Sequence, residues 1–161
     1  MVSCKEFKKK QKTFIKKDTL LFIKKEQRYA YAICLKENNL PIDYVNIDLD
    51  DSHDLGYGLK KEYWHQGIVS EAVEAVIQQA KKDNLCYLTA THDIKNIHSG
   101  NVMKKVGMHY CYSYKEQWMP KNRPVIFRMY QINLDGKNGF IKNIGINMNI
   151  LLKKTYKGQV I

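Results

Sequence analysis

The stretch YWHQGIVSEAVEAV, from Tyr63 to Val76, places a single glycine between a turn and a run with helical periodicity. The run after Gly67 predicts a helix over about 68–83, because its apolar residues recur along one helix face. Those residues are Ala72, Val73, Val76, Ile77 and Ala80. Gly67 therefore stands at a helix N-terminus. There it either eases a tight turn or leaves the first backbone amides open to an anion, which unpaired N–H groups and the helix dipole attract.

The segments around this helix predict an α+β fold. Runs rich in aromatic and β-branched residues predict strands at 28–35, 42–49, 55–59, 86–91, 108–118 and 124–134. A second helix is expected over 99–106, with Ser99 as its N-cap and Gly107 just past its end. The strand, helix, strand order around 68–83 favours one parallel crossover within a mostly antiparallel sheet. Gly56 and Gly58, inside one strand, mark either a bulge or the close approach of another group.

The positive charge of the chain lies at its two ends. Of the net charge of +11, residues 1–25 carry +7, residues 135–161 carry +4, and the segment between them is neutral. A nucleic-acid-binding fold usually carries its basic patch on the structured body, so solvated basic tails are favoured over a nucleic-acid site. We expect a lysine-rich N-terminal segment at 1–27, in which 5–17 is compatible with a short helix of weak apolar side, a core at 28–134, and a basic and apolar extension at 135–161. The extension is expected to form a further strand or helix and to pack on the body or on a second copy in a homodimer.

The sequence also limits the class of protein. No apolar run approaches the roughly 20 residues that span a bilayer, and the N-terminus lacks the apolar stretch of a signal peptide, so a cytoplasmic protein without a membrane segment is expected. The four cysteines and five histidines are scattered, with no CxxC pair and no zinc-like spacing. We therefore expect reduced thiols and no metal site.

Two segments resemble a known family. GYGLKKEYWHQGIVSEA (56–72) is similar to the strand, turn and helix start of the GNAT superfamily of acyl-CoA-dependent N-acetyltransferases, in particular the branch that acetylates ribosomal-protein N-termini and related amines. NIHSGNVMKKVGM (96–108) resembles the later motif of the same family. The resemblance covers about residues 28–134. It implies a twisted, mostly antiparallel sheet with a central parallel strand pair that splays apart for acetyl-CoA, flanked by helices.

The resemblance also implies a site. In the family, the turn that begins the helix presents backbone amides to the diphosphate of coenzyme A; here that turn is Gln66, Gly67, Ile68, Val69 and Ser70. Backbone groups near Leu59 would hold the thioester, and Asn96 would hydrogen-bond the pantetheine, unless it is an ordinary turn residue. Ser99 would donate to the departing thiolate, a role that stands beside its plain use as an N-cap. Asp54 is the expected general base, with Glu116 second.

The implied activity is transfer of an acetyl group from acetyl-CoA to a primary amine of a protein N-terminus or a small molecule. Three departures leave an alternative open. Fewer than thirty residues precede the 28–35 strand, where the family has a strand and two helices that wall the acceptor site, so the domain resembles an N-terminally shortened member. Met103 stands where many members have a tyrosine donor, and Val69 is bulkier than expected. The alternative is a catalytically idle domain that binds coenzyme A or a partner protein.

Overall fold

The computed structural model describes residues 4–5, 13–17, 28–119 and 121–139. In chain order its elements are β1 (Cys4–Lys5), β2 (Thr13–Lys17), β3 (Arg28–Leu35), β4 (Pro41–Asp48), β5 (Leu55–Tyr57), a 3₁₀ turn (Lys61–Tyr63), α1 (Ile68–Lys82), β6 (Tyr87–Asp93), α2 (Ile97–Lys105), β7 (His109–Trp118) and β8 (Arg123–Asn133). From Arg28 onward the observed strands and helices agree with those expected to within about two residues at each end. The α+β class is confirmed.

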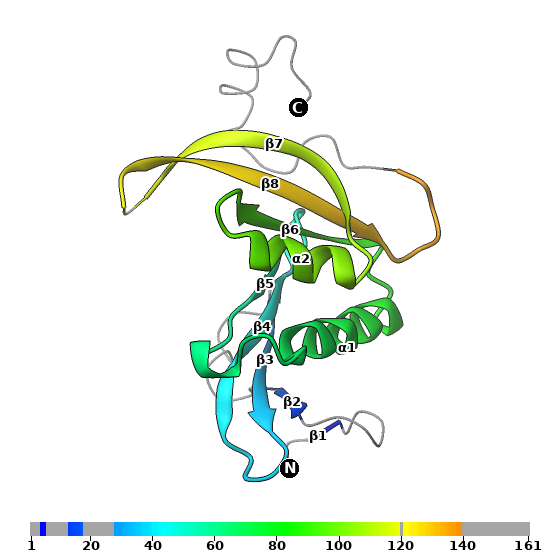
Figure 1. Cartoon of the computed structure of the whole chain (residues 1–161). Helices are drawn as coiled ribbons and strands as arrows, with labels where there is room; N and C mark the ends of the chain where they lie inside the picture. Colours follow the sequence, from blue (N-terminus) through cyan, green and yellow to red (C-terminus); the bar gives the residue numbers. More distant parts are fainter. Residues whose placement is uncertain (1–3, 6–12, 18–27, 120, 140–161) are drawn as a thin grey trace.

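The strands form two antiparallel sheets that meet along one short line. One sheet has the order β1-β2-β3-β4-β5 and the other the order β6-β8-β7. They are joined by a single parallel bridge between Asp54 and Thr89, where the Thr89 amide donates to the His53 carbonyl (3.2 Å). Beyond this bridge β5 and β6 run apart (Figure 1). The expected splayed parallel pair at the centre of the fold is therefore confirmed.

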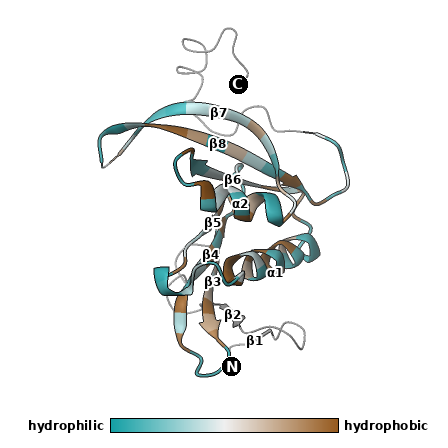
Figure 2. Cartoon of the chain, viewed as in Figure 1, coloured by the Kyte–Doolittle hydropathy of each residue, from teal (hydrophilic) through white to brown (hydrophobic). Residues whose placement is uncertain are grey.

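Both helices pack against one face of this divided sheet. The apolar stripe of α1 is buried, and it forms one core with side chains of the strands and of α2. Figure 2 shows hydrophobic positions along α1 and along β3, which lies beside it. The strand and α2 residues of this core include Ile33, Ile42, Val45, Ile47, Leu55, Leu88, Ala90 and Met103. Leu55 and Leu88 lie in this core, so they point to the sheet face that the helices cover. Neighbouring residues of a strand point to opposite faces, and the side chains of Asp54 and Thr89 therefore point to the face away from the helices.

The short helix considered for 5–17 does not form over 13–17, the larger part of that range that the structure describes. Thr13–Lys17 forms β2, which pairs with β3 in antiparallel register from Thr13 opposite Leu35 to Lys17 opposite Tyr31. Two β-branched residues and a phenylalanine at 13–15 favour a strand, and the pairing supplies partners for the outer backbone groups of β3. Local lysine spacing carried no information about this long-range pairing.

The two glycines near β5 allow close approach of side chains. A Cβ on Gly56 would lie 2.7 Å from Oδ1 of Asn46, and one on Gly58 would lie 2.6 Å from Oδ1 of Asp43. Gly58 also donates its amide to the Tyr44 carbonyl (3.1 Å). The close-approach interpretation of these glycines is therefore correct, and side chains of β4 occupy the space.

Gly100, within α2, gives a first prediction. A Cβ at this position would lie 2.7 Å from Nε2 of His92, a side chain that is 5% exposed and packs on Tyr130 at a ring distance of 5.6 Å. Alanine in a helix gains up to about 1 kcal/mol over glycine, but overpacking a buried site costs about 1–3 kcal/mol. We expect Gly100→Ala to lower the free energy of unfolding by about 1 kcal/mol in urea titrations. His92→Ala combined with Gly100→Ala should remove the clash, and a penalty that persists in the double variant would contradict this explanation.

The last described residues, after β8, pack against that strand. Residues after β8 turn back on it, where the side-chain amides of Gln131 and Asn133 both donate to the Gly139 carbonyl (2.9 and 2.8 Å). The apolar strand or helix expected within 141–152 lies outside the described residues, and the segment boundaries at 27/28 and 134/135 remain predictions. Within the described ranges, neither helix is long and apolar enough to cross a membrane.

Candidate functional site

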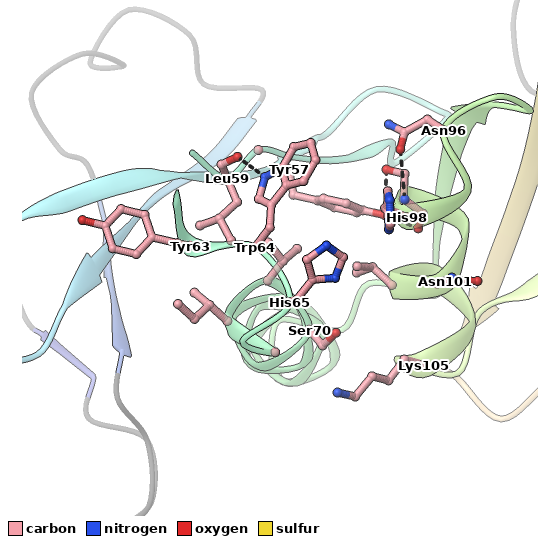
Figure 3. Close-up of a pocket in the computed structure, with 16 residues that line it drawn as sticks. Tyr57, Leu59, Tyr63, Trp64, His65, Ser70, Asn96, His98, Asn101 and Lys105 are labelled. Carbon is pink, nitrogen blue, oxygen red and sulfur yellow. Dashed lines mark hydrogen bonds between the residues drawn. The ribbon is translucent and has the colours of Figure 1, made fainter. Parts of the chain in front are cut away.

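A cavity of about 490 Å³ lies where β5 ends and the two helices begin. Its walls come from three segments: residues 57–59 after the bridge, the turn and first residues of α1, and one face of α2 (Figure 3). None of its lining residues carries a carboxylate. The cavity is therefore a polar and aromatic space whose only formal charge, apart from histidine, is positive.

The N-terminus of α1 opens into this cavity. Gly67 is the N-cap residue, with φ of 78°, and no side chain of the described residues caps the helix there. Ile68, Val69 and Ser70 begin the helix, and all three line the cavity. The first amides of a helix lack intrahelical partners, so these N–H groups are available to a ligand. The left-handed φ of Gly67 favours glycine, and no side chain of the described residues caps the amides beside it, while anion binding at this helix end stays a prediction.

The turn before α1 is held by its own hydrogen bonds. The indole Nε1 of Trp64 donates to the Leu59 carbonyl (2.7 Å), and Nε2 of Gln66 donates to the Glu62 carbonyl (3.3 Å). Leu59 lines the cavity, whereas Gln66 is exposed and does not. What Leu59 offers a ligand is its amide and the second lone pair of its carbonyl. Of the residues expected in the diphosphate turn, Gln66 is the member that the structure leaves outside.

The start of α2 corrects one assignment. Asn96, not Ser99, is the N-cap residue, and its Oδ1 accepts the Ser99 amide (3.3 Å). Both residue types cap helices well, so the sequence did not separate them. Ser99 lies in the first turn instead, and both residues line the cavity. The capping role of Asn96 uses its carbonyl oxygen and not its amide nitrogen.

The hydroxyl of Ser99 meets that of Tyr57. Ser99 Oγ donates to the Tyr57 hydroxyl at 3.3 Å, while the Tyr57 hydroxyl donates to the Ser99 carbonyl at 2.8 Å. Burial raises the pKa of Tyr57 to about 12, with the Ser99 hydrogen bond acting in the opposite direction. Since the Ser99 bond is the longer one, the serine hydroxyl is the group more easily redirected toward a ligand.

A second cavity, of about 290 Å³, lies beside the Asp54–Thr89 bridge. Asp54, Thr89 and Thr91 line it, and they alternate with residues of the helix-side core. This cavity therefore opens on the sheet face opposite α1 and α2. Its other lining residues are Asp48, Asp50, Ser52, Tyr112, Tyr114 and Met129.

The carboxyl group of Asp54, which lines this second cavity, has a raised pKa. Burial, followed by the negative charges of Asp48 and Asp50, raises the pKa of Asp54 from 3.8 to about 6. A carboxylate of this kind accepts a proton more readily near neutral pH than an ordinary aspartate. Glu116, the second expected base, is exposed on β7 and lines neither cavity.

Several cavity residues were not anticipated. The α2 face that lines the cavity carries His98, Asn101, Val102 and Lys105, which fall at i, i+3, i+4 and i+7 and so share one helix face. The imidazole of His65 meets that of His98 at a ring distance of 5.2 Å, which links the turn before α1 to α2. Once the position of α2 is known, this i, i+3, i+4, i+7 spacing predicts from the sequence that the four side chains share one helix face. Tyr57 could have been assigned from strand alternation with Leu55.

Comparisons with known proteins bear on the family and on the fold. The family model described as an acetyltransferase (GNAT) domain matches residues 5–109. Among solved structures, a GNAT-family acetyltransferase from Bacillus anthracis is 22% identical with a TM-score of 0.59, covering 66% of each chain. The ribosomal-protein-S5-alanine acetyltransferase of Vibrio fischeri is 19% identical with a TM-score of 0.64, covering 70% of this chain and 65% of that one.

A third solved structure contains a ligand. It is a ribosomal L7/L12 α-N-protein acetyltransferase in complex with coenzyme A, 16% identical with a TM-score of 0.62, covering 69% of this chain and 64% of that one. At these identities the likeness concerns the fold, and the chain spans slightly less than two thirds of the length of these three structures. No curated protein matches the sequence. The family match, which covers most of the chain, decides the assignment: the chain belongs to the GNAT acetyltransferase family.

Proposed function

We propose that this chain is an acetyltransferase that transfers the acetyl group of acetyl-CoA to a primary amine of a protein N-terminus or a small molecule. The observation that carries the proposal is the uncapped N-terminus of α1, which opens into the same cavity as Leu59, Asn96 and Ser99. An anion-binding helix end and a channel between diverging strands are the two features that a diphosphate with a long neutral arm requires.

The donor fits the larger cavity by chemistry. Its diphosphate would accept hydrogen bonds from the amides at Ile68, Val69 and Ser70, and the absence of carboxylates from the lining removes a source of repulsion. The Leu59 backbone would hold the pantetheine arm where β5 leaves β6. The complex of the related ribosomal L7/L12 α-N-protein acetyltransferase with coenzyme A supports this choice of donor.

In the reaction, the amine nitrogen attacks the thioester carbonyl, the C–S bond breaks, and the thiolate leaves. A hydrogen bond from the Ser99 hydroxyl would stabilise the negative charge on sulfur, while Tyr57, which donates its proton to the Ser99 carbonyl, would hold Ser99 in place. A phenol with a pKa near 12 stays protonated, but full transfer to a thiolate whose acid has a pKa of about 8.5 is uphill by about 5 kcal/mol. Tyr57 therefore keeps its proton, and the Ser99 hydroxyl acts as the hydrogen-bond donor to sulfur, a role that Met103 cannot fill.

The amine would approach from the opposite sheet face. The second cavity lies there, and Asp54 in it would take the proton that the amine nitrogen loses, directly or through water. The amine and the thioester would meet near β5, because Tyr57 at its end lines the larger cavity and Asp54, just before it, lines the second one. Holding the two reactants in a reactive orientation supplies much of the rate.

The alternative, an idle domain that binds coenzyme A, differs in one measurable result. We expect calorimetric titration to show acetyl-CoA binding, and thiol-release assays over a panel of amines to show turnover. Ser99→Ala should keep acetyl-CoA affinity within about threefold and lower kcat on the order of a hundredfold, as for loss of a single donor to a developing charge. Binding without turnover for every amine would favour the idle domain, and no binding at millimolar acetyl-CoA would reject both.

A further inference from the structure

The second cavity combines carboxylates with aromatic rings. Asp48, Asp50 and Asp54 line it, and none of its described lining residues is a lysine, an arginine or a histidine. The rings of Tyr112 and Tyr114, whose centroids are 6.2 Å apart, line it from β7. The whole chain has a net charge of +11, so this lining has the opposite sign to the protein as a whole. Carboxylates attract a cation, and the face of a tyrosine ring adds a cation–π contact.

The three carboxylates differ in the partners that the described residues give them. Asp48 forms an ion pair with Arg28, and Asp50 accepts hydrogen bonds from the amide and the hydroxyl of Ser52. Within the described part of the chain, the carboxyl group of Asp54 has neither a hydrogen-bond donor nor a basic partner. Burial and the neighbouring charges disfavour its ionised form, which is why its pKa is raised. A cation bound in the cavity would offset this unfavourable interaction.

The arrangement of these carboxylates suits an organic cation better than a metal ion. Among the described residues, no three aspartate, glutamate, histidine or cysteine side chains are placed to hold a metal ion. The three carboxylates therefore suit an occupant that distributes its charge along its length, as an aliphatic diamine does. A volume of about 290 Å³ is at the lower end of the range for ligand pockets, which favours a small acceptor over the terminal segment of a protein.

We propose that the second cavity selects an acceptor with a second positive charge, namely a small aliphatic diamine. This inference rests on the proposed function. One nitrogen loses a proton to Asp54 and forms the new N–C bond, while the C–S bond breaks and the thiolate takes a proton from water. The other nitrogen stays an ammonium group, because alkylamines such as the lysine side chain have a pKa of about 10.4. Asp50 and the two tyrosine rings bind this ammonium group, and Asp48, shared with Arg28, adds to the negative potential.

The test compares three amines with the same number of carbon atoms. Beyond the reacting amine, putrescine ends in a second ammonium group, n-butylamine in a methyl group and γ-aminobutyrate in a carboxylate. Thiol release from acetyl-CoA by the full chain gives kcat/KM for each amine. After correction for its two equivalent nitrogens, putrescine should exceed n-butylamine by about tenfold or more, and n-butylamine should exceed γ-aminobutyrate by a similar factor.

Asp50→Asn and Asp51→Asn form a matched pair of variants. Asp51 is exposed, follows Asp50 directly and does not line the cavity. We expect Asp50→Asn to reduce the preference for putrescine over n-butylamine by about fivefold or more, and Asp51→Asn to leave it within about twofold. The preference is the readout because a change in folding, or in the base Asp54, acts on both amines alike and cancels in their ratio.

Two kinds of failure are distinguishable. If the wild-type chain acetylates putrescine no faster than n-butylamine, the diamine inference is overturned while the proposed function stands. The inference is also overturned if the preference is unchanged in Asp50→Asn, or if Asp50→Asn and Asp51→Asn reduce it equally. Absence of turnover with every amine is a different result, and it would reject the proposed function itself.

Discussion

Gly67→Ala should weaken acetyl-CoA binding on the order of a hundredfold. A Cβ at Gly67 would enter the cavity, where the nearest atom is Nζ of Lys105 at 3.9 Å, so the methyl group would occupy space beside the helix amides. Hydrogen bonds to charged groups contribute about 1.5–3 kcal/mol each, and loss of even one or two amide contacts to a diphosphate accounts for an effect of this size. Calorimetric titration with acetyl-CoA measures it.

The same substitution also strains the backbone. Gly67 has a φ of 78°, and a residue with a side chain in the left-handed region costs about 1–2 kcal/mol. Gly136 is the matched control, because its φ is 76° and nothing lies within 4 Å of a Cβ built there. We expect Gly136→Ala to lower the free energy of unfolding by a similar amount while acetyl-CoA binds as in the wild type. Normal binding by Gly67→Ala would show that the diphosphate does not contact this helix end.

The position of Gly67 at a helix N-terminus was predictable from the sequence, because the pattern of neighbouring residues alone decides where α1 begins. The 3.6-residue apolar period of α1 decides where the helix lies, and its buried residues, among them Val73 and Val76, are those expected. A glycine immediately before that period therefore marks the helix mouth. The strand order around α1 then follows from the parallel crossover, and this is why the divided sheet could be anticipated.

Contacts between distant segments were not predictable in the same way. Tyr57 and Ser99 are 42 residues apart, and their hydrogen bonds depend on how α2 docks against β5. The pairing of β2 with β3 is likewise a tertiary event that overrides the local lysine pattern. The N-cap of α2 was predicted at Ser99 instead of Asn96 for another reason: both residue types cap helices well, and the two stand only three positions apart.

Asp54→Asn should reduce activity and raise stability at neutral pH. As the proposed base, Asp54 accepts the amine proton, and loss of a general base lowers the rate about 10²–10⁴-fold. Asparagine keeps the shape of the side chain but cannot accept a proton. We expect kcat in thiol-release assays to fall by at least about a hundredfold, while acetyl-CoA, bound on the other sheet face, keeps its wild-type affinity.

The gain in stability follows from the direction of the pKa shift. Burial, with the charges of Asp48 and Asp50 next, raises the pKa of Asp54 from 3.8 to about 6. The folded state therefore binds this proton more tightly than the unfolded state, so the wild-type chain loses stability as pH rises from about 4 to about 6 and no more above that. Two pKa units correspond to about 3 kcal/mol, an upper bound for the advantage of Asp54→Asn at pH 7–8. Urea titrations at pH 4 and pH 7.5 should show the advantage only at the higher pH.

Asp50→Asn supplies a control of opposite sign in the same cavity. The hydrogen bond from the Ser52 hydroxyl, followed by that from the Ser52 amide, lowers the pKa of Asp50, with burial opposing them. The ionised form of Asp50 therefore stabilises the folded state above its unfolded pKa, and its removal should lower stability at pH 7.5. It should also lower the pKa of Asp54, because one of the two repelling charges is gone. If Asp54→Asn is as active as the wild type yet more stable, the buried carboxylate is not the base; if it is neither less active nor more stable, the ionisation of Asp54 has been misassigned.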